Sequence, residues 1–311
     1  MKLIDLHCDT ILRCVDSKGE IKLRENDLCI DVKKLKKAGS LAQFFAMYVD
    51  FEKDVEHLDR CLDMIDNFYN EIEENSDDIA FAGSIADMER NSSQGKISAF
   101  LAIEEGGVLE GKLQNLRNLY RLGVRLITLT WNFPNCIGYP NFEWKHQNEG
   151  LTPFGEEVVA EMNRLGIIID VAHLSDKGFY DVARLSEKPF VASHSNARAV
   201  EGHSRNLTDE MLKLLAEKGG VTGLNLEPIF LGGGGTLEMM VKQISHMRKV
   251  AGIDVVAIGT DFDGTSPLTV IKDISYMELL FDALSKAGFT AEELDKVSYR
   301  NAERVVREVM R

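Results

Sequence analysis

Six polar side chains in this sequence lie at the end of a short apolar run or just after it. They are His7, Asp9, Glu104, His173, His194 and Asp261. The apolar runs are typical of buried parallel strands, and in a barrel of parallel strands the carboxyl ends converge on one pocket. We therefore expect these side chains to meet. Three imidazoles and three carboxylates exceed the ligand set of one tetrahedral zinc ion, and they suit two divalent metal ions that share a bridging carboxylate.

The pattern His7-Cys8-Asp9 places an imidazole and a carboxylate on the same side of a strand end, where both can bind one metal ion. Alternation along the strand turns Cys8 to the opposite face, so we do not expect it to be a ligand. Alone this motif is weak, because a surface histidine and an aspartate that caps the next turn would give the same sequence. Two histidines in equivalent positions on consecutive predicted strands, His173 and His194, favour the metal interpretation.

Two pairs of neighbouring acids offer alternatives for the site. Glu104 and Glu105 are adjacent, and only one of them can face the pocket. We expect Glu104 to bridge the metals, because a carboxylate that ends a central strand needs a cation to offset its burial. Asp261 comes first off its strand and is our candidate for acid–base chemistry or for a contact with a substrate amine. Asp263 is expected to shape the turn with Gly264.

The other polar candidates carry less specific signals. Arg205 follows the sixth predicted strand and could hold a substrate carboxylate in bidentate fashion, although a salt bridge at a helix start fits the same sequence. The remaining histidines lie in predicted helices or loops, and we expect them at the surface. They are His57, His146, His203 and His246.

The elements that must position these residues alternate along the chain. Apolar runs predict eight strands, at 3–7, 41–48, 98–103, 125–130, 167–172, 190–194, 221–226 and 255–260. Amphipathic patterns predict helices at 55–74, 113–122, 154–165, 176–185, 208–217, 237–250 and 276–286. This alternation is typical of a (β/α)8 TIM barrel, and we expect one such domain over residues 1–311. Residues 131–150, rich in Asn, Pro and aromatics, are expected to form a long loop over the barrel mouth and a substrate lid.

Composition narrows the classes of partner. The formal net charge of −14 argues against nucleic acid, whose phosphates need clustered lysines and arginines. No apolar stretch approaches the roughly 18 residues of a membrane span, and we identify no secretory signal. The five cysteines, an odd number without a Cys-x-x-Cys pair, indicate reduced thiols and a cytoplasmic location.

Several segments, in the same order over nearly the whole chain, resemble the membrane (renal) dipeptidase family of binuclear zinc peptidases, a branch of the amidohydrolase superfamily. The segments are LHCD, AIEEGG, LGVRLITLTWN, LTPFGEEVVAEMNRLGIIIDVAHLS, SHSNARAV, SRNLTDE and IGTDFDG. The resemblance implies a zinc-dependent dipeptidase on a TIM barrel, often a homodimer. At the matching positions it implies one zinc at His7, Asp9 and Glu104, a second at Glu104, His173 and His194, Asp261 beside the bridging water and the substrate amine, and Arg205 on the substrate carboxylate.

One position departs from the family pattern. Mammalian members have a histidine after the fourth strand that contacts the substrate near the scissile carbonyl, where this sequence has Trp131 followed by Asn132. The indole N–H or the side-chain amide could make that contact instead. A single-metal deaminase or cyclic-amide hydrolase on the same fold is one alternative, but such sites usually open with His-x-His. A catalytically silent barrel that binds a small ligand is the other.

Overall fold

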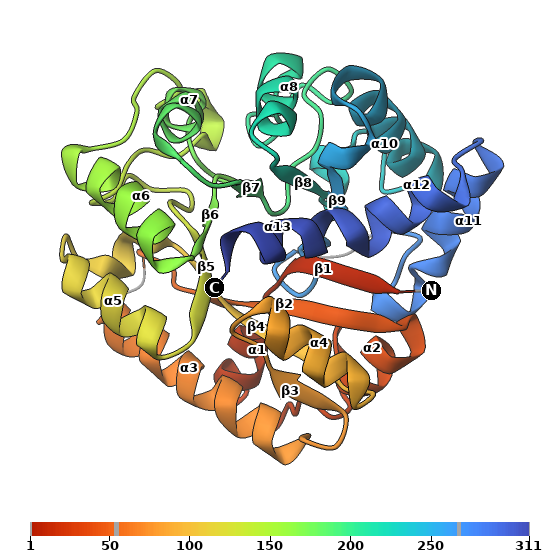
Figure 1. Cartoon of the computed structure of the whole chain (residues 1–311), viewed down its shortest axis with the longest axis horizontal. Coiled ribbons are helices and arrows are strands. Elements are labelled where there is room, and N and C mark those ends of the chain that lie inside the picture. Colours follow the sequence, from red (N-terminus) through yellow and green to blue (C-terminus); the bar gives the residue numbers. More distant parts are fainter. Residues whose placement is uncertain (1, 53–55, 266–268, 311) are drawn as a thin grey trace.

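Eight parallel strands close into a barrel in this computed structural model, which describes residues 2–52, 56–265 and 269–310 (Figure 1). Around the barrel the strands pair in the order β2-β1-β9-β8-β7-β6-β5-β4, and a pairing between β2 and β4 closes the ring. The strands are β1 (Leu3–Cys8), β2 (Ser40–Tyr48), β4 (Ile97–Glu104), β5 (Val124–Thr128), β6 (Ile168–Asp170), β7 (Val191–Ala192), β8 (Val221–Leu224) and β9 (Val256–Ile258). This is the (β/α)8 architecture that the alternation of patterns predicts.

All eight predicted strands are present, because an apolar run that is buried on both faces leaves little ambiguity. The predictions were too long at several strand ends, and the stretch 190–194 keeps only Val191–Ala192 as strand. A ninth strand, β3 (Ile79–Phe81), pairs with the start of β4 and was not predicted. Three residues are too few to give a periodic signal.

The helices pack around the barrel and across one of its ends (Figure 1). They are α1 (Thr10–Asp16), α2 (Val32–Ala38), α3 (His57–Glu74), α4 (Ile85–Ser93), α5 (Leu113–Arg121), α6 (Pro153–Leu165), α7 (Asp176–Leu185), α8 (Asp209–Glu217), α9 (Pro228–Leu231), α10 (Leu237–Ala251), α11 (Glu278–Lys286), α12 (Ala291–Asp295) and α13 (Asn301–Val309). All seven predicted helices are found. The predicted start of the first of them, Val55, lies outside the described residues. Short helices such as α1, α2 and α4 were not predicted.

The last helix, α13, closes the end of the barrel opposite the carboxyl ends of the strands (Figure 1). Its apolar residues Ala302, Val305 and Val306 pack against Ile4, Ala42 and other residues that fill the barrel interior. This end is therefore a packed core, which leaves the other end for a site. No helix among the described residues combines the length and the apolarity needed to cross a membrane.

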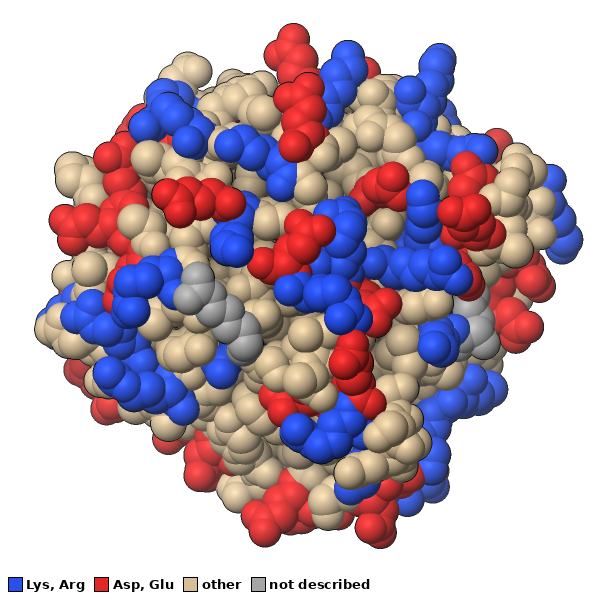
Figure 2. All heavy atoms as spheres, viewed as in Figure 1, with Lys and Arg blue, Asp and Glu red and all other residues tan. Residues whose placement is uncertain are grey.

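The face that carries α13 has lysines and arginines interspersed with aspartates and glutamates (Figure 2). Among the described residues on this face, no continuous basic stripe of the kind that follows a phosphate backbone is seen. The mixture matches an acidic protein whose charges are spread over its surface.

Strands β7, β8 and β9 approach closely because two glycines have no side chain. A Cβ atom at Gly259 would lie 1.7 Å from the Ser193 carbonyl oxygen, and one at Gly223 would lie 2.0 Å from the same oxygen. Ser193 precedes His194, and Gly259 lies two residues before Asp261. The close approach therefore fixes how far apart two of the candidate site residues stand.

We expect Gly259→Ala to destabilise the fold by about 3 kcal/mol or more, because the added methyl group meets backbone rather than a side chain that can move. The midpoint of denaturant unfolding measures this effect. Gly202→Ala is the matched control, since nothing lies within 4 Å of a Cβ there, and it should change stability by less than about 0.5 kcal/mol. Equal midpoints for the two variants would contradict the prediction.

Candidate functional site

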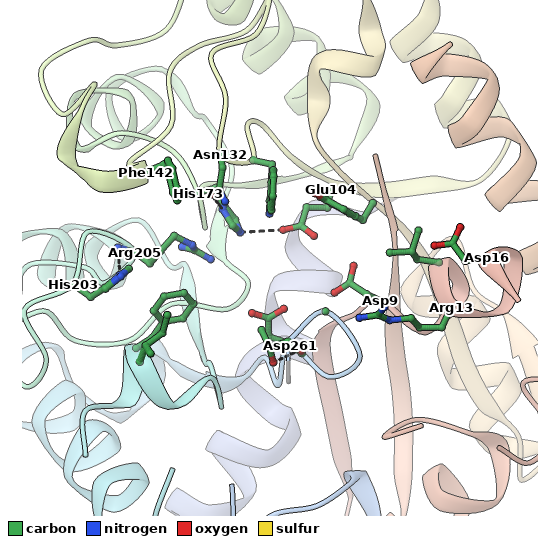
Figure 3. Close-up of a pocket in the computed structure, with 17 residues that line it drawn as sticks. Asp9, Arg13, Asp16, Glu104, Asn132, Phe142, His173, His203, Arg205 and Asp261 are labelled. Carbon is green, nitrogen blue, oxygen red and sulfur yellow. Dashed lines mark hydrogen bonds and ion pairs between the residues drawn. The ribbon is translucent and has the colours of Figure 1, made fainter. Parts of the chain in front are cut away.

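The predicted site residues meet in a cavity of about 470 Å³ at the carboxyl ends of the strands (Figure 3). Its lining comes from the ends of β2 and β4, from Asp9 and α1, and from the segments after β5, β6, β7, β8 and β9. The lining residues are Asp9, Leu12, Arg13, Asp16, Tyr48, Glu104, Trp131, Asn132, Phe142, His173, His203, Arg205, Ile229, Phe230, Asp261, Gly264 and Thr265. His7 and His194 lie beneath this lining and are fully buried.

Glu104 stands at the centre of the donor cluster. Its Oε1 lies 3.0 Å from His173 Nε2 (Figure 3). The same oxygen lies 3.6 Å from His194 Nε2, and Oε2 lies 3.3 Å from His7 Nε2. His7 Nε2 is also 3.3 Å from Asp9 Oδ2 and 3.9 Å from Asp261 Oδ1. The donors thus form overlapping groups, with Glu104 shared between the group of His7 and Asp9 and the group of His173 and His194.

Buried acids behind the cluster orient it. Asp170, inside β6, accepts hydrogen bonds from the hydroxyls of Thr128 and Ser193, each at 2.6 Å. The Ser193 hydroxyl lies 2.7 Å from His194 Nδ1, so this chain fixes the ring whose Nε2 faces Glu104. Sequence reasoning missed Asp170. An acid within an apolar run is itself a signal, because a buried carboxylate needs partners.

Asp5, a buried acid inside β1, orients the other side of the site. It accepts from the backbone N–H and the hydroxyl of Thr260, both at 2.8 Å, and from the Gln43 amide at 2.9 Å. Thr260 immediately precedes Asp261, whose backbone is in the left-handed region with φ of +61°. Asp261 is further fixed by the Asn225 amide, which donates to its Oδ2 at 2.9 Å. A non-glycine residue in this region is held by its surroundings.

The second member of each acid pair points away from the cluster. Glu105, with φ of +90°, accepts from the backbone N–H groups of Gly107 and Trp131 and from the Asn135 amide. Asp263 accepts from the Thr10 hydroxyl at 2.7 Å and from the backbone N–H groups of residues 29 and 30. Asp263 therefore does more than shape its own turn, because it also holds the segment that leads into α2.

Burial and close charges shift the titration of these groups. Burial would raise the pKa of Glu104, but the imidazoles of His7 and His173 reverse this and hold it well below its usual range. Burial raises the pKa of Asp9 to about 6 and that of Asp261 to about 7. Burial lowers the pKa of His173 to about 3, so its ring is neutral and its nitrogen lone pair is available to a metal ion.

Arg205 lies in the opposite part of the cavity from Asp9 (Figure 3). Its guanidinium is buried, donates to the backbone carbonyls of Ala172 and His194 and lies over the Phe230 ring. Burial lowers its pKa to about 10, which leaves it cationic at neutral pH. No acid among the described residues forms an ion pair with it, so the salt bridge considered as its alternative role is not found there.

The two residues that follow β5 reach the cavity in different ways. Asn132 Oδ1 lies 3.2 Å from His173 Nδ1, which orients that ring. Trp131 packs edge-on against Tyr48 at a centroid distance of 4.9 Å and lies 6.2 Å from the His173 ring. Both line the cavity, as does Phe142 from the same segment, residues 131–150. Tyr48 was missed from the sequence, although it ends a predicted strand.

The expectation that the other histidines lie at the surface was wrong for His203. It lines the cavity, accepts a hydrogen bond from the Arg205 backbone N–H at 3.1 Å and packs against Phe230. His57 is partly buried and stacks on a phenylalanine. His146 and His246 pair with acids at partly exposed positions. Sequence position does not reveal that the loop after β7 folds back over the site.

The donor set fits divalent metal ions. His7 Nδ1 and Nε2 and Asp9 Oδ1 are buried and have no hydrogen-bond partner within the part of the chain that the structure describes. Such orphaned polar atoms are costly unless a further partner binds them. Nitrogen and carboxylate donors within 4.8 Å of one another are what zinc and related ions take, and a carboxylate shared between two groups suits a metal pair.

Comparisons with known proteins identify the family and the fold of this chain. The profile of the family described as membrane dipeptidase (peptidase family M19) matches residues 1–311. An uncharacterised protein of Klebsiella pneumoniae, encoded in the pqqA 5′ region, is 35% identical over 239 residues, which cover 73% of this chain and 87% of that protein. The solved structure of dipeptidase AC, an M19 metallopeptidase, is similar with a TM-score of 0.94 and 27% identity over 100% of this chain and 99% of that one.

A second solved structure adds a ligand. It is a metallopeptidase from Rhodobacter sphaeroides bound to a phosphinate mimic of the dipeptide L-Ala-D-Ala, with a TM-score of 0.92 and 26% identity over 99% of both chains. A probable dipeptidase, PvdM, from Pseudomonas aeruginosa shares the fold, with a TM-score of 0.85 and 21% identity over 96% of this chain and 98% of that one.

Proposed function

Because this chain belongs to the membrane dipeptidase family, we propose that it hydrolyses the peptide bond of dipeptides with two zinc ions held at the mouth of its barrel. It is a metallo-dipeptidase by its family and by its likeness to solved dipeptidases. The observation that carries the binuclear site is the convergence of two donor groups on one carboxylate, that of Glu104. His7 and Asp9 would complete one group, and His173 and His194 the other.

The metal ions would activate a water molecule near neutral pH and polarise the scissile carbonyl. The chain's own residues would transfer the proton and orient the substrate. Asp261 takes the proton of the attacking water and returns it to the leaving amine. Its place beside Asp9 and His7, and the Asn225 amide that fixes one of its oxygens, support this role. Trp131 and Asn132 are the proposed donors to the carbonyl oxygen in place of the family histidine.

Contacts at the two ends of the cavity would limit the length of the substrate. Arg205 would hold the free carboxylate of the substrate in bidentate fashion, and Asp261 its free amine. Both groups line one cavity and are held by hydrogen bonds to their neighbours, so a chain with a third residue would have to give up one of the contacts. The dipeptide mimic bound to the R. sphaeroides relative supports this choice of substrate. Peptide hydrolysis is therefore favoured over a deaminase or a silent binding barrel.

The remaining proposals concern the cellular setting. The five cysteines are free, which supports our proposal of a reducing, cytoplasmic location. The homodimer that the resemblance implies stays a prediction.

We expect the purified protein to contain about two zinc ions per chain and to cleave L,L- or L,D-dipeptides but not the matching tripeptides. Chelation should abolish cleavage, because the proposed nucleophile exists only with the metal bound, and added zinc should restore it. Elemental analysis and a small peptide panel measure this. Metal without cleavage would shift the assignment to another reaction, tripeptide cleavage at equal rate would overturn the length argument, and a metal-free protein that cleaves dipeptides would overturn the mechanism.

A further inference from the structure

We propose that Arg13 selects dipeptides whose N-terminal residue has an acidic side chain. This inference rests on the proposed function and adds a substrate class to it. Arg13 lies on α1, four residues after Asp9, so the helix places both on the same side. It lines the cavity, and Figure 3 shows its side chain running from α1 toward Asp9. Arg13 and Arg205 are the arginines that the cavity lining contains, and they come from different walls.

A backbone contact fixes the Arg13 side chain without using its outer nitrogens. Nε donates to the Asp263 carbonyl oxygen at 2.7 Å. Asp263 is itself anchored through its carboxylate by Thr10 and by residues 29 and 30, which makes the acceptor rigid. Within the described residues, the Arg13 side chain has no other hydrogen bond and no ion pair. The outer edge of the guanidinium is left to bind a planar carboxylate.

The neighbouring acids do not neutralise Arg13. Asp16, one turn further along α1 and also in the cavity lining, forms an ion pair with Arg60 from α3. Asp9 is a proposed metal ligand, and Asp261 lies beside the same histidine, His7, so divalent cations bound there would offset the charge of both acids. The rim beside α1 is therefore basic once the metals are bound.

The proposed binding mode puts the N-terminal residue of the substrate at this rim. With the substrate carboxylate at Arg205, the peptide would extend past Glu104 toward Asp9 and α1, which lie on the other side of the cavity in Figure 3. Its amine would then lie at Asp261, and its first side chain would face the α1 wall. A glutamate or aspartate side chain there can form paired hydrogen bonds with Arg13, whereas a lysine would be repelled.

The test compares isosteric substrates, so that size does not change with charge. We expect the wild-type enzyme to have a kcat/KM about tenfold higher for Glu-Ala than for Gln-Ala, and lower still for Lys-Ala. In Arg13→Gln the Glu-Ala to Gln-Ala ratio should fall to about one, and in Arg13→Glu the order should reverse in favour of Lys-Ala. Arg13→Lys should keep part of the preference, because the positive charge remains but the paired N–H donors of the guanidinium are lost.

Arg121→Gln is the matched control. Arg121 ends α5 at the other end of the barrel, donates to Asn118 and has no acidic partner among the described residues, so the variant makes the same change in net charge far from the cavity. It should keep the wild-type ratio. Melting temperatures check that each variant folds. A wild-type ratio within twofold of one would overturn the inference, as would an unchanged ratio in Arg13→Gln. Failure to cleave any dipeptide would instead overturn the proposed function.

Discussion

Glu104→Gln should remove both metal ions and lower kcat/KM for dipeptides by on the order of 10³-fold or more. An outer partner of a metal ligand is worth about 10- to 100-fold, and a carboxylate shared by two ions should be worth more. Both oxygens of Glu104 face imidazole nitrogens, on one side His7 and on the other His173. Glutamine has one acceptor oxygen and no charge, so it cannot serve both groups. Elemental analysis after desalting and steady-state kinetics measure the two effects.

Glu105→Gln is the control for this experiment, because it makes the same change one residue further on. Glu105 accepts hydrogen bonds from the segment after β5 and is not part of the donor groups among the described residues. The variant should keep its metal content and lose stability, since an amide cannot satisfy all three donors that meet this carboxylate. If Glu105→Gln lost the metals and Glu104→Gln kept them, the bridging role would belong to Glu105.

Asp261→Asn should lower kcat by about 10²- to 10⁴-fold while the metal content stays the same, which is the range for a group that transfers protons. Burial raises the pKa of Asp261 to about 7, and bound divalent cations would lower it again. A carboxylate of this kind can accept and return a proton near neutral pH, whereas an amide cannot. The amide still fits the hydrogen-bonding site, so we expect the thermal midpoint to change little.

Asp263→Asn is the control that distinguishes a loss of proton transfer from a change in local structure. Asp263 lies two residues further on, and its carboxylate accepts three hydrogen bonds that fix α1 and the segment before α2. This variant should lose thermal stability and keep most of its kcat, the reverse of Asp261→Asn. A loss of metal in Asp261→Asn, or equal losses of kcat in the two variants, would contradict the proton-transfer role.

The barrel could be predicted because its signals are local. Strands such as β4 and β1 are buried along their whole length and most of their residues are apolar, which a sequence displays directly. The two residues of β7 were predicted as part of a longer strand, since the chain is apolar there before it turns. Short helices such as α1 have too few residues for a periodic pattern, and their stability comes from packing on the barrel.

The site residues divide in the same way, into those that a local sequence signal reveals and those that only the tertiary structure places. Residues that follow strands, such as His173 and Asp261, could be placed in one pocket from topology alone. The orientation of Glu105 depends on a backbone φ of +90°, and no pattern of residue types specifies that angle. Arg13 was not predicted because it follows no strand and reaches the cavity from a helix that the sequence did not reveal. His203 reaches it from a loop, where the path depends on tertiary contacts.

The ring order of the strands also constrains when the enzyme can become active during its synthesis. His7 and Asp9 are made before the other ring strands. One neighbour of β1 is nevertheless β9, through the pairing of Asp5 with Ile258 and the hydrogen bond from the Asp9 N–H to the Phe262 carbonyl. β9 is the ring strand that comes last in chain order, so it is made long after β1. An unfinished chain would carry most of the metal-binding groups without the neighbour that aligns the first two of them. We therefore expect metal loading to follow the synthesis of β9, so that a barrel without this strand has no active site.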